Sequence, residues 1–149
     1  MHDRRRPSLI GQPAALARSH PAPPPARPGA PAVPVPGAHA AVWVVGPDDD
    51  LVELLALTVA RAGAVPLRLG VPDADRRLGP ERPAAAIVDL GPPLAASLRL
   101  TRRLKREQVP TVLLTSGEPP ACRGSARLTC LTKPFRPSEV RRRLASVAG

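Results

Sequence analysis

The chain has 149 residues, enough for one domain, and a formal net charge of +10 at pH 7. One Trp, one Phe and no Tyr argue against base stacking as a mode of single-stranded nucleic-acid binding. All three histidines precede residue 40, so the rest of the chain offers no imidazole for general-base catalysis, a Ser-His site or a zinc site. We therefore do not expect a dedicated enzyme.

Residues 1–39 differ in composition from the rest of the chain. They hold ten of the 22 prolines and almost no large apolar residues. Such a segment cannot bury enough apolar surface to offset its ordering entropy. We predict a disordered or polyproline-like tail over residues 1–39, for which a mis-assigned start codon is an alternative explanation, and a folded domain over residues 40–149. Without an apolar signal segment or membrane span, we expect a cytoplasmic protein.

The first predicted strand is the apolar run at residues 41–45, which ends at Gly46-Pro47. The acids Asp48–Asp50 follow, and acids in a first turn stabilise a helix N-terminus. Gly63 is a natural C-terminal stop for this helix. Its apolar residues at helical spacing are Leu51, Leu54, Leu55, Val59 and Ala62.

The middle of the domain continues the alternation of strands and helices. Residues 64–69 predict a second strand, which Pro66 places at a sheet edge. Residues 72–78 predict a short helix, and residues 84–88 a third strand. Residues 94–105 predict a helix with one stripe of Leu94, Leu98, Thr101 and Leu104.

Two further strands are predicted at residues 111–114 and 128–131. The segment between them contains Pro119-Pro120, which leaves room for at most one helical turn. Ser138 is expected to cap a last helix, whose inward-facing residues would be Val140, Leu144 and Val147. Strands and helices that alternate in this way imply a parallel sheet with right-handed crossovers.

Three of the predicted strands lead into reactive polar residues, namely Asp89, Thr115-Ser116 and Thr132-Lys133. The carboxyl ends of parallel strands share one edge of the sheet, where ligands bind in open α/β folds. Asp, Thr and Lys at that edge suit the handling of a phosphoryl group. Taken alone, each residue also has an ordinary structural explanation, such as a strand-end Asp89 that caps the next turn.

Together, the segments IVDLG (87–91), LLTS (113–116) and LTKPF (131–135) resemble the receiver domain of bacterial two-component response regulators. The resemblance covers residues 41–147. It implies an α/β, flavodoxin-like fold with a doubly wound five-stranded parallel sheet in the order 2-1-3-4-5. It also implies a stand-alone receiver in phosphorelay signal transduction, with a histidine kinase or other phosphodonor and a downstream protein as partners.

The resemblance assigns a role to each polar strand end. Asp89 would be the phosphoacceptor and form an acyl phosphate, as carboxylate nucleophiles can. Lys133 would neutralise phosphoryl oxygens, and the Thr115 hydroxyl would hydrogen-bond one of them. A chain competent for phosphorylation would also need Mg²⁺, bridging the phosphate and several carboxylates, whereas an incompetent chain would need no cofactor.

The chain departs from the family where a pair of metal-binding acids normally follows the first strand. In the register that matches the spacing to Gly63, Gly46-Pro47 replaces that pair and Asp48 falls one place beyond it. The rival register treats Gly46-Pro47 as an insertion and makes Asp48 and Asp49 metal ligands beside Asp89, at the cost of about half a turn of helix. We favour the first register, and phosphorylation would then be slow.

Two other functions stay open. The chain could be a pseudo-receiver, which acts as a protein-interaction module without phosphorylation. The basic clusters Arg99–Arg106 and Arg141–Arg143 also allow a basic nucleic-acid-associated protein. Cys122 and Cys130 are too few for a disulfide framework and lack metal-ligand spacing, so we expect reduced cysteines. Cys130 also stands where receivers carry an aromatic residue, three positions before Lys133.

Overall fold

A computed structural model describes residues 41–117, 122 and 125–149 of the chain. The predicted tail over residues 1–39 lies outside the described residues, and so does most of the predicted turn around Pro119-Pro120. The domain division therefore stays a prediction. None of the helices in the described ranges is long and apolar enough to cross a membrane.

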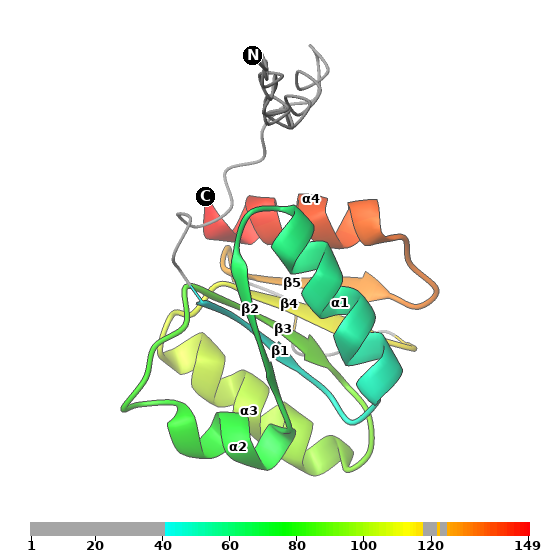
Figure 1. The fold of residues 1–149 in the computed structure, drawn as a ribbon. Coiled ribbons are helices and arrows are strands. Elements are labelled where there is room, and N and C mark those ends of the chain that lie inside the picture. Colours follow the sequence, from blue (N-terminus) through cyan, green and yellow to red (C-terminus); the bar gives the residue numbers. More distant parts are fainter. Residues whose placement is uncertain (1–40, 118–121, 123–124) are drawn as a thin grey trace, which may run out of the picture. The chain divides into compact units, whose positions relative to one another are not determined.

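Five strands form one parallel sheet in the order β2-β1-β3-β4-β5 (Figure 1). This confirms the flavodoxin-like order, which reverses direction between β1 and β3. The strands are β1 (Ala41–Val45), β2 (Val65–Leu69), β3 (Ala85–Asp89), β4 (Thr111–Thr115) and β5 (Leu128–Thr132). As Pro66 predicts, β2 is an edge strand.

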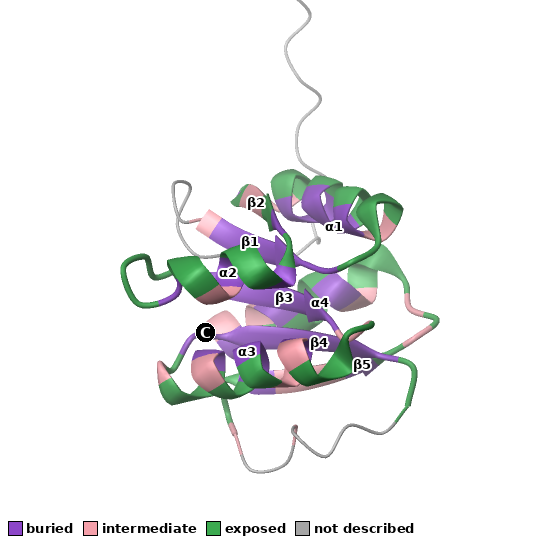
Figure 2. Ribbon diagram, turned by 90° about the horizontal axis from the view of Figure 1, so that it is seen from below, coloured by how far each residue is buried: buried purple, intermediate pink, exposed green. Residues whose placement is uncertain are grey.

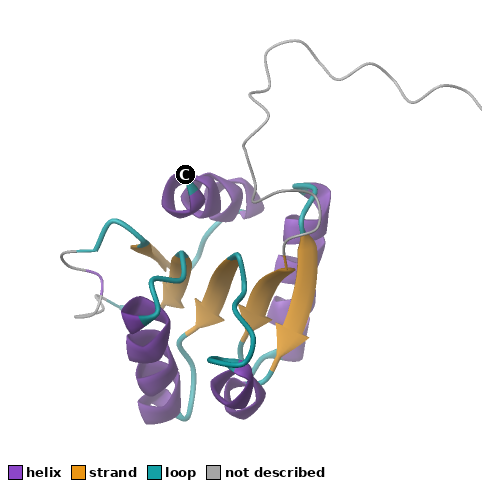
Figure 3. Cartoon of the chain, turned by 90° about the vertical axis from the view of Figure 1, so that its left-hand side faces the viewer, coloured by secondary structure: helices purple, strands orange, loops and turns teal. Residues whose placement is uncertain are grey.

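Within the described residues, four α-helices cover the two faces of the sheet (Figures 1 and 3). One face carries α1 (Asp49–Arg61) and α4 (Pro137–Ala148), and the other carries α2 (Val71–Arg77) and α3 (Leu94–Arg106). Every residue of the central strands β3 and β4 is buried. The outer surfaces of the helices are exposed (Figure 2). The sheet therefore separates two apolar cores, one beneath each pair of helices.

The buried faces of two helices differ from the apolar stripes in the sequence. Leu54 of α1 is 46% exposed, and Leu94 of α3 is 54% exposed. Both helices contain more leucines than one face can hold, so packing against the sheet selects among them. The residues that α1 buries are Val52, Leu55, Ala56, Thr58 and Val59. Those that α3 buries are Ser97, Leu100, Thr101 and Leu104.

The start of α4 also differs from the prediction. Arg136, and not Ser138, is the N-cap residue, and its backbone N–H donates to Oε2 of Glu139 at 2.6 Å. Pro137 takes the first helical position, where a missing N–H costs nothing. The inward-facing residues are as predicted, since all three are buried: Val140, Leu144 and Val147.

Helix α2 has only seven residues, too few to be stable without tertiary support. Arg103 of α3 supplies part of that support. Its Nη1 donates to Oδ1 of Asp75 at 2.8 Å, and its Nη2 donates to the carbonyl of Leu78 at 2.8 Å. One arginine of the basic cluster on α3 therefore has a structural role, which is to hold α3 against the end of α2.

Replacing Leu144 tests the core beneath α1 and α4. Leu144→Ala should lower the free energy of unfolding by about 2–5 kcal/mol, because the deletion leaves a cavity. Leu57→Ala is the matched control, because Leu57 is 51% exposed and should change stability little. Urea denaturation measures both values, and equal losses would contradict this packing.

Candidate functional site

Asp89 is the last residue of β3, the central strand, and it is only 2% exposed. It lies in register with Leu114 of β4, while the preceding residue, Val88, pairs with Val45 of β1. The carboxylate is therefore at the carboxyl edge of the sheet, next to the point where the strand order reverses. This is the position at which open α/β sheets bind ligands.

Lys133 meets Asp89 from the end of β5. Its backbone N–H donates to the carbonyl of Thr115 at 2.7 Å, which fixes the residue beside β4. Its Nζ lies 2.5 Å from Oδ1 of Asp89, and the lysine side chain is 30% exposed. At this distance the ammonium group is in direct contact with the carboxylate oxygen. The contact is thus an ion pair that balances a buried charge.

Thr115 ends β4 beside this pair, but its hydroxyl is engaged elsewhere. The hydroxyl donates to the carbonyl of Gly117 at 2.9 Å and accepts from the Gly117 N–H at 3.1 Å. These two bonds close the turn after the strand. The structure therefore brings Asp89 and Lys133 together and directs the Thr115 hydroxyl into a local turn.

The loop after β1 packs directly on Asp89, a contact that the sequence did not predict. A Cβ atom at Gly46 would lie 2.9 Å from Cβ of Asp89, and one at Gly91 would lie 2.7 Å from Cγ of Pro47. Real side chains do not approach so closely, so positions 46 and 91 require glycine. The two glycines let the Gly46-Pro47 loop close over the carboxylate.

Asp48 comes after this loop as the N-cap residue of α1. Its Oδ1 accepts a hydrogen bond from the Leu51 N–H at 3.1 Å. Strand β1 ends at Val45, and α1 has 13 residues and begins at Asp49. Two residues without side-chain oxygens, Gly46 and Pro47, therefore directly follow β1.

The residues around Asp89 do not fit a bound Mg²⁺. This ion needs several oxygen ligands, but the described ranges contain no group of three or more His, Cys, Asp or Glu side chains placed to hold a metal. Gly46 and Pro47 offer no side-chain oxygen, and Asp48 caps a helix. The ammonium group of Lys133 already lies against the Asp89 carboxylate.

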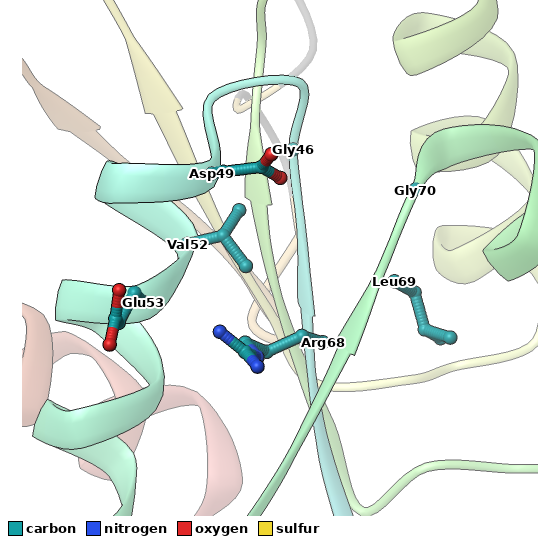
Figure 4. A pocket seen from close by; sticks show the side chains of 7 residues that line it. All are labelled: Gly46, Asp49, Val52, Glu53, Arg68, Leu69 and Gly70. Atoms are coloured by element: carbon teal, nitrogen blue, oxygen red, sulfur yellow. The ribbon is translucent and has the colours of Figure 1, made fainter.

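A cavity of about 500 Å³ lies beside the site, between α1 and β2 (Figure 4). Asp49 and Glu53 line one wall, and Arg68 lines the opposite wall. No ion pair within 4.0 Å links Arg68 to either acid in the described part of the chain. Gly46, which packs on Asp89, also lines this cavity, so the cavity lies next to the Gly46-Pro47 loop.

The expectation of two unpaired cysteines is wrong. The sulfur atoms of Cys122 and Cys130 are in contact, and their Cα atoms are 6.0 Å apart. Both side chains pack against the core beneath α2 and α3. The separation of eight residues between them in the sequence did not predict this contact, because sequence spacing alone does not show which side chains meet in the fold.

The two basic clusters of the sequence lie on opposite faces of the sheet. Arg102, Lys105 and Arg106 are exposed on α3, whereas Arg141–Arg143 are exposed on α4. Because the sheet separates the two helices, the clusters do not combine into one basic surface.

No protein-family model matches the sequence, and no curated protein matches it significantly. Solved structures do match its fold. Chemotaxis protein CheY4 of Vibrio cholerae is 19% identical, with a TM-score of 0.62 over 73% of this chain and 98% of that chain. The signal receiver domain of a signal transduction histidine kinase from Syntrophus aciditrophicus is 23% identical, with a TM-score of 0.59 over 72% and 90%.

A third match is the receiver domain of Francisella response regulator 1452, which is 17% identical, with a TM-score of 0.61 over 73% of this chain and 96% of that chain. The described domain thus has the fold of response regulator receiver domains. The expected resemblance is confirmed at the level of the fold, including the order of its five strands.

Replacing Gly46 tests the close packing on Asp89. Gly46→Ala should destabilise the protein by about 1–3 kcal/mol, because the added methyl group meets Cβ of a buried side chain that cannot move away. Gly117→Ala is the control, since a Cβ atom there has no neighbour within 4 Å. Equal unfolding free energies for the two variants would rule out this contact.

Replacing Lys133 tests the ion pair. Lys133→Met should lower stability at pH 7 by about 2–3 kcal/mol, because it leaves the Asp89 carboxylate buried without a counter-charge. The double variant Asp89→Asn/Lys133→Met should be more stable than the single Lys133→Met variant, since it removes both charges. Chemical denaturation of the wild type, Asp89→Asn, Lys133→Met and the double variant gives the coupling energy, and a double variant no more stable than Lys133→Met would refute the pairing.

Proposed function

We propose that this chain is a signalling module of the receiver type that works through protein contacts and does not use Mg²⁺-dependent phosphorylation of Asp89 as its switch. The observation that carries the proposal is the packing around Asp89. Gly46-Pro47 closes over the carboxylate, and Lys133 lies against its Oδ1 atom. The partner would be another protein of a two-component pathway.

Electrostatics supports this proposal. Transfer of a phosphoryl group to a carboxylate brings negative charges together, and catalysis of such a step depends on positioning and on cations that neutralise the charge. Lys133 supplies one positive charge, which already balances Asp89. Among the described residues, no pair of acids directly follows β1 to hold a divalent cation at this edge, so the transfer would lack its main source of charge stabilisation.

A slow phosphoacceptor is the second candidate, and one observation favours it. Asp89 and Lys133 lie together at the carboxyl edge of the sheet, so a carboxylate nucleophile and a cation for phosphoryl oxygens are side by side. Lys133 would then turn from the carboxylate to the phosphoryl oxygens, and the Thr115 hydroxyl would have to leave Gly117. Both rearrangements oppose the reaction, which is why we expect it to be slow.

A labelling experiment distinguishes the two candidates. The protein is incubated with a small phosphodonor, such as acetyl phosphate, with and without saturating Mg²⁺, and acyl phosphate is measured by mass spectrometry. We expect little or no labelling and no acceleration by Mg²⁺. Asp89→Asn is the control for labelling at other residues. Rapid, Mg²⁺-dependent labelling that Asp89→Asn abolishes would overturn the proposal, whereas slow labelling would favour the second candidate.

Trp43 offers an independent readout in the same experiment. It is buried in β1, three residues before Gly46, and it is the only tryptophan of the chain. Because no divalent ion should bind beside this strand, millimolar Mg²⁺ should leave its fluorescence unchanged. Saturable quenching at millimolar or lower Mg²⁺ would restore Asp48 and Asp49 as candidate ligands.

A further inference from the structure

Cys122 and Cys130 meet on one face of β5. Cys130 lies within the strand, in register with Leu113 of β4, and Cys122 lies in the connection from β4 to β5. The Cα–Cα separation of 6.0 Å is within the range that disulfide bonds span. Both side chains are half-buried and pack against the core beneath α2 and α3. They are the only cysteines in the chain.

The connection between β4 and β5 explains why this contact matters. Neighbouring parallel strands need a crossover, which usually contains a helix that covers the sheet. The described residues between Thr115 and Leu128 form no α-helix. Among the described residues of this connection, Cys122 packs on the core beneath α2 and α3. Its contact with Cys130 links this point of the connection to β5.

We propose that Cys122 and Cys130 form a reversible disulfide bond, which fastens the β4–β5 connection to β5 and makes this edge of the domain sensitive to redox conditions. The inference does not depend on the proposed function, because it concerns Cys122 and Cys130 against the core beneath α2 and α3, and not the contact of Lys133 with Asp89. In a reducing compartment a disulfide of this kind forms transiently and senses oxidants. The partial exposure of both cysteines gives a small oxidant access.

The bond can form by exchange with a small disulfide such as oxidised glutathione. The thiolate of one cysteine, having lost its proton to solvent, attacks a sulfur of the oxidant and displaces one thiol. The thiolate of the second cysteine then attacks the mixed disulfide and displaces the other thiol. Two protein thiols are oxidised and one small disulfide is reduced to two thiols, so electrons and protons balance.

The first test counts thiols in the full chain. The protein is equilibrated in reduced or in oxidised glutathione, quenched with acid, denatured and labelled with a maleimide of known mass. We expect two labels after reduction and none after oxidation, with the oxidised protein monomeric. Two labels after oxidation, a stable glutathione adduct on the native protein, or a disulfide-linked dimer would each overturn the proposal. Cys122→Ser should instead retain the adduct on Cys130, because no second thiol resolves it.

The second test measures stability. The bond closes a ring from residue 122 to residue 130, so oxidation should raise the unfolding midpoint by about 5–10 °C. The double variant Cys122→Ser/Cys130→Ser should show no difference between oxidised and reduced conditions. A shift that persists in the double variant would mean that the bond is not its cause, and identical midpoints for the oxidised and reduced wild-type protein would contradict a fastening role.

Discussion

The buried carboxylate of Asp89 determines which residues can surround it in the site. Asp89 ends the central strand, where both neighbouring strands and the loop after β1 exclude water from it. An isolated carboxylate in such a place would cost several kcal/mol, so a cation has to accompany it. Lys133 provides that cation, which ties the end of β5 to β3 across β4. The glycines at positions 46 and 91 follow from the same constraint, because larger residues would displace the loop that covers the acid.

The fold could be predicted from the sequence because the strands are short apolar runs that end in turn or polar residues. The run at 41–45 became β1 with the predicted bounds, and Gly63 follows α1 with a φ of +89°, as a helix stop should. The helix faces could not be predicted as well. Leucine-rich helices such as α3 offer several apolar stripes, and only packing shows that Leu100 is buried and Leu94 is not. Helix α4 begins earlier than predicted, at Pro137, because proline is favoured at the first position of a helix as serine is favoured at the N-cap.

The residue types at the sheet edge were visible in the sequence, but their relations were not. Strand order alone brings the ends of β3, β4 and β5 to one edge, so the proximity of Asp89 and Lys133 follows from the topology. Their roles in phosphoryl transfer stay predictions. The turn that occupies the Thr115 hydroxyl depends on the backbone at Gly117, and the fit of Gly46 against Asp89 depends on tertiary contact. A single sequence does not contain a local pattern for either one.

The edge strand β2 has a consequence for how the molecule behaves among copies of itself. An open sheet edge can recruit a strand from a neighbouring molecule and seed aggregation. Pro66 lacks the N–H that such pairing needs, and Arg68 sets a charge on the same short strand, where it lines the cavity against α1. A second copy that added a strand beside β2 would find no N–H donor at Pro66. It would also lie close to the charged side chain of Arg68. The β2 edge of the sheet is therefore poorly suited to strand exchange.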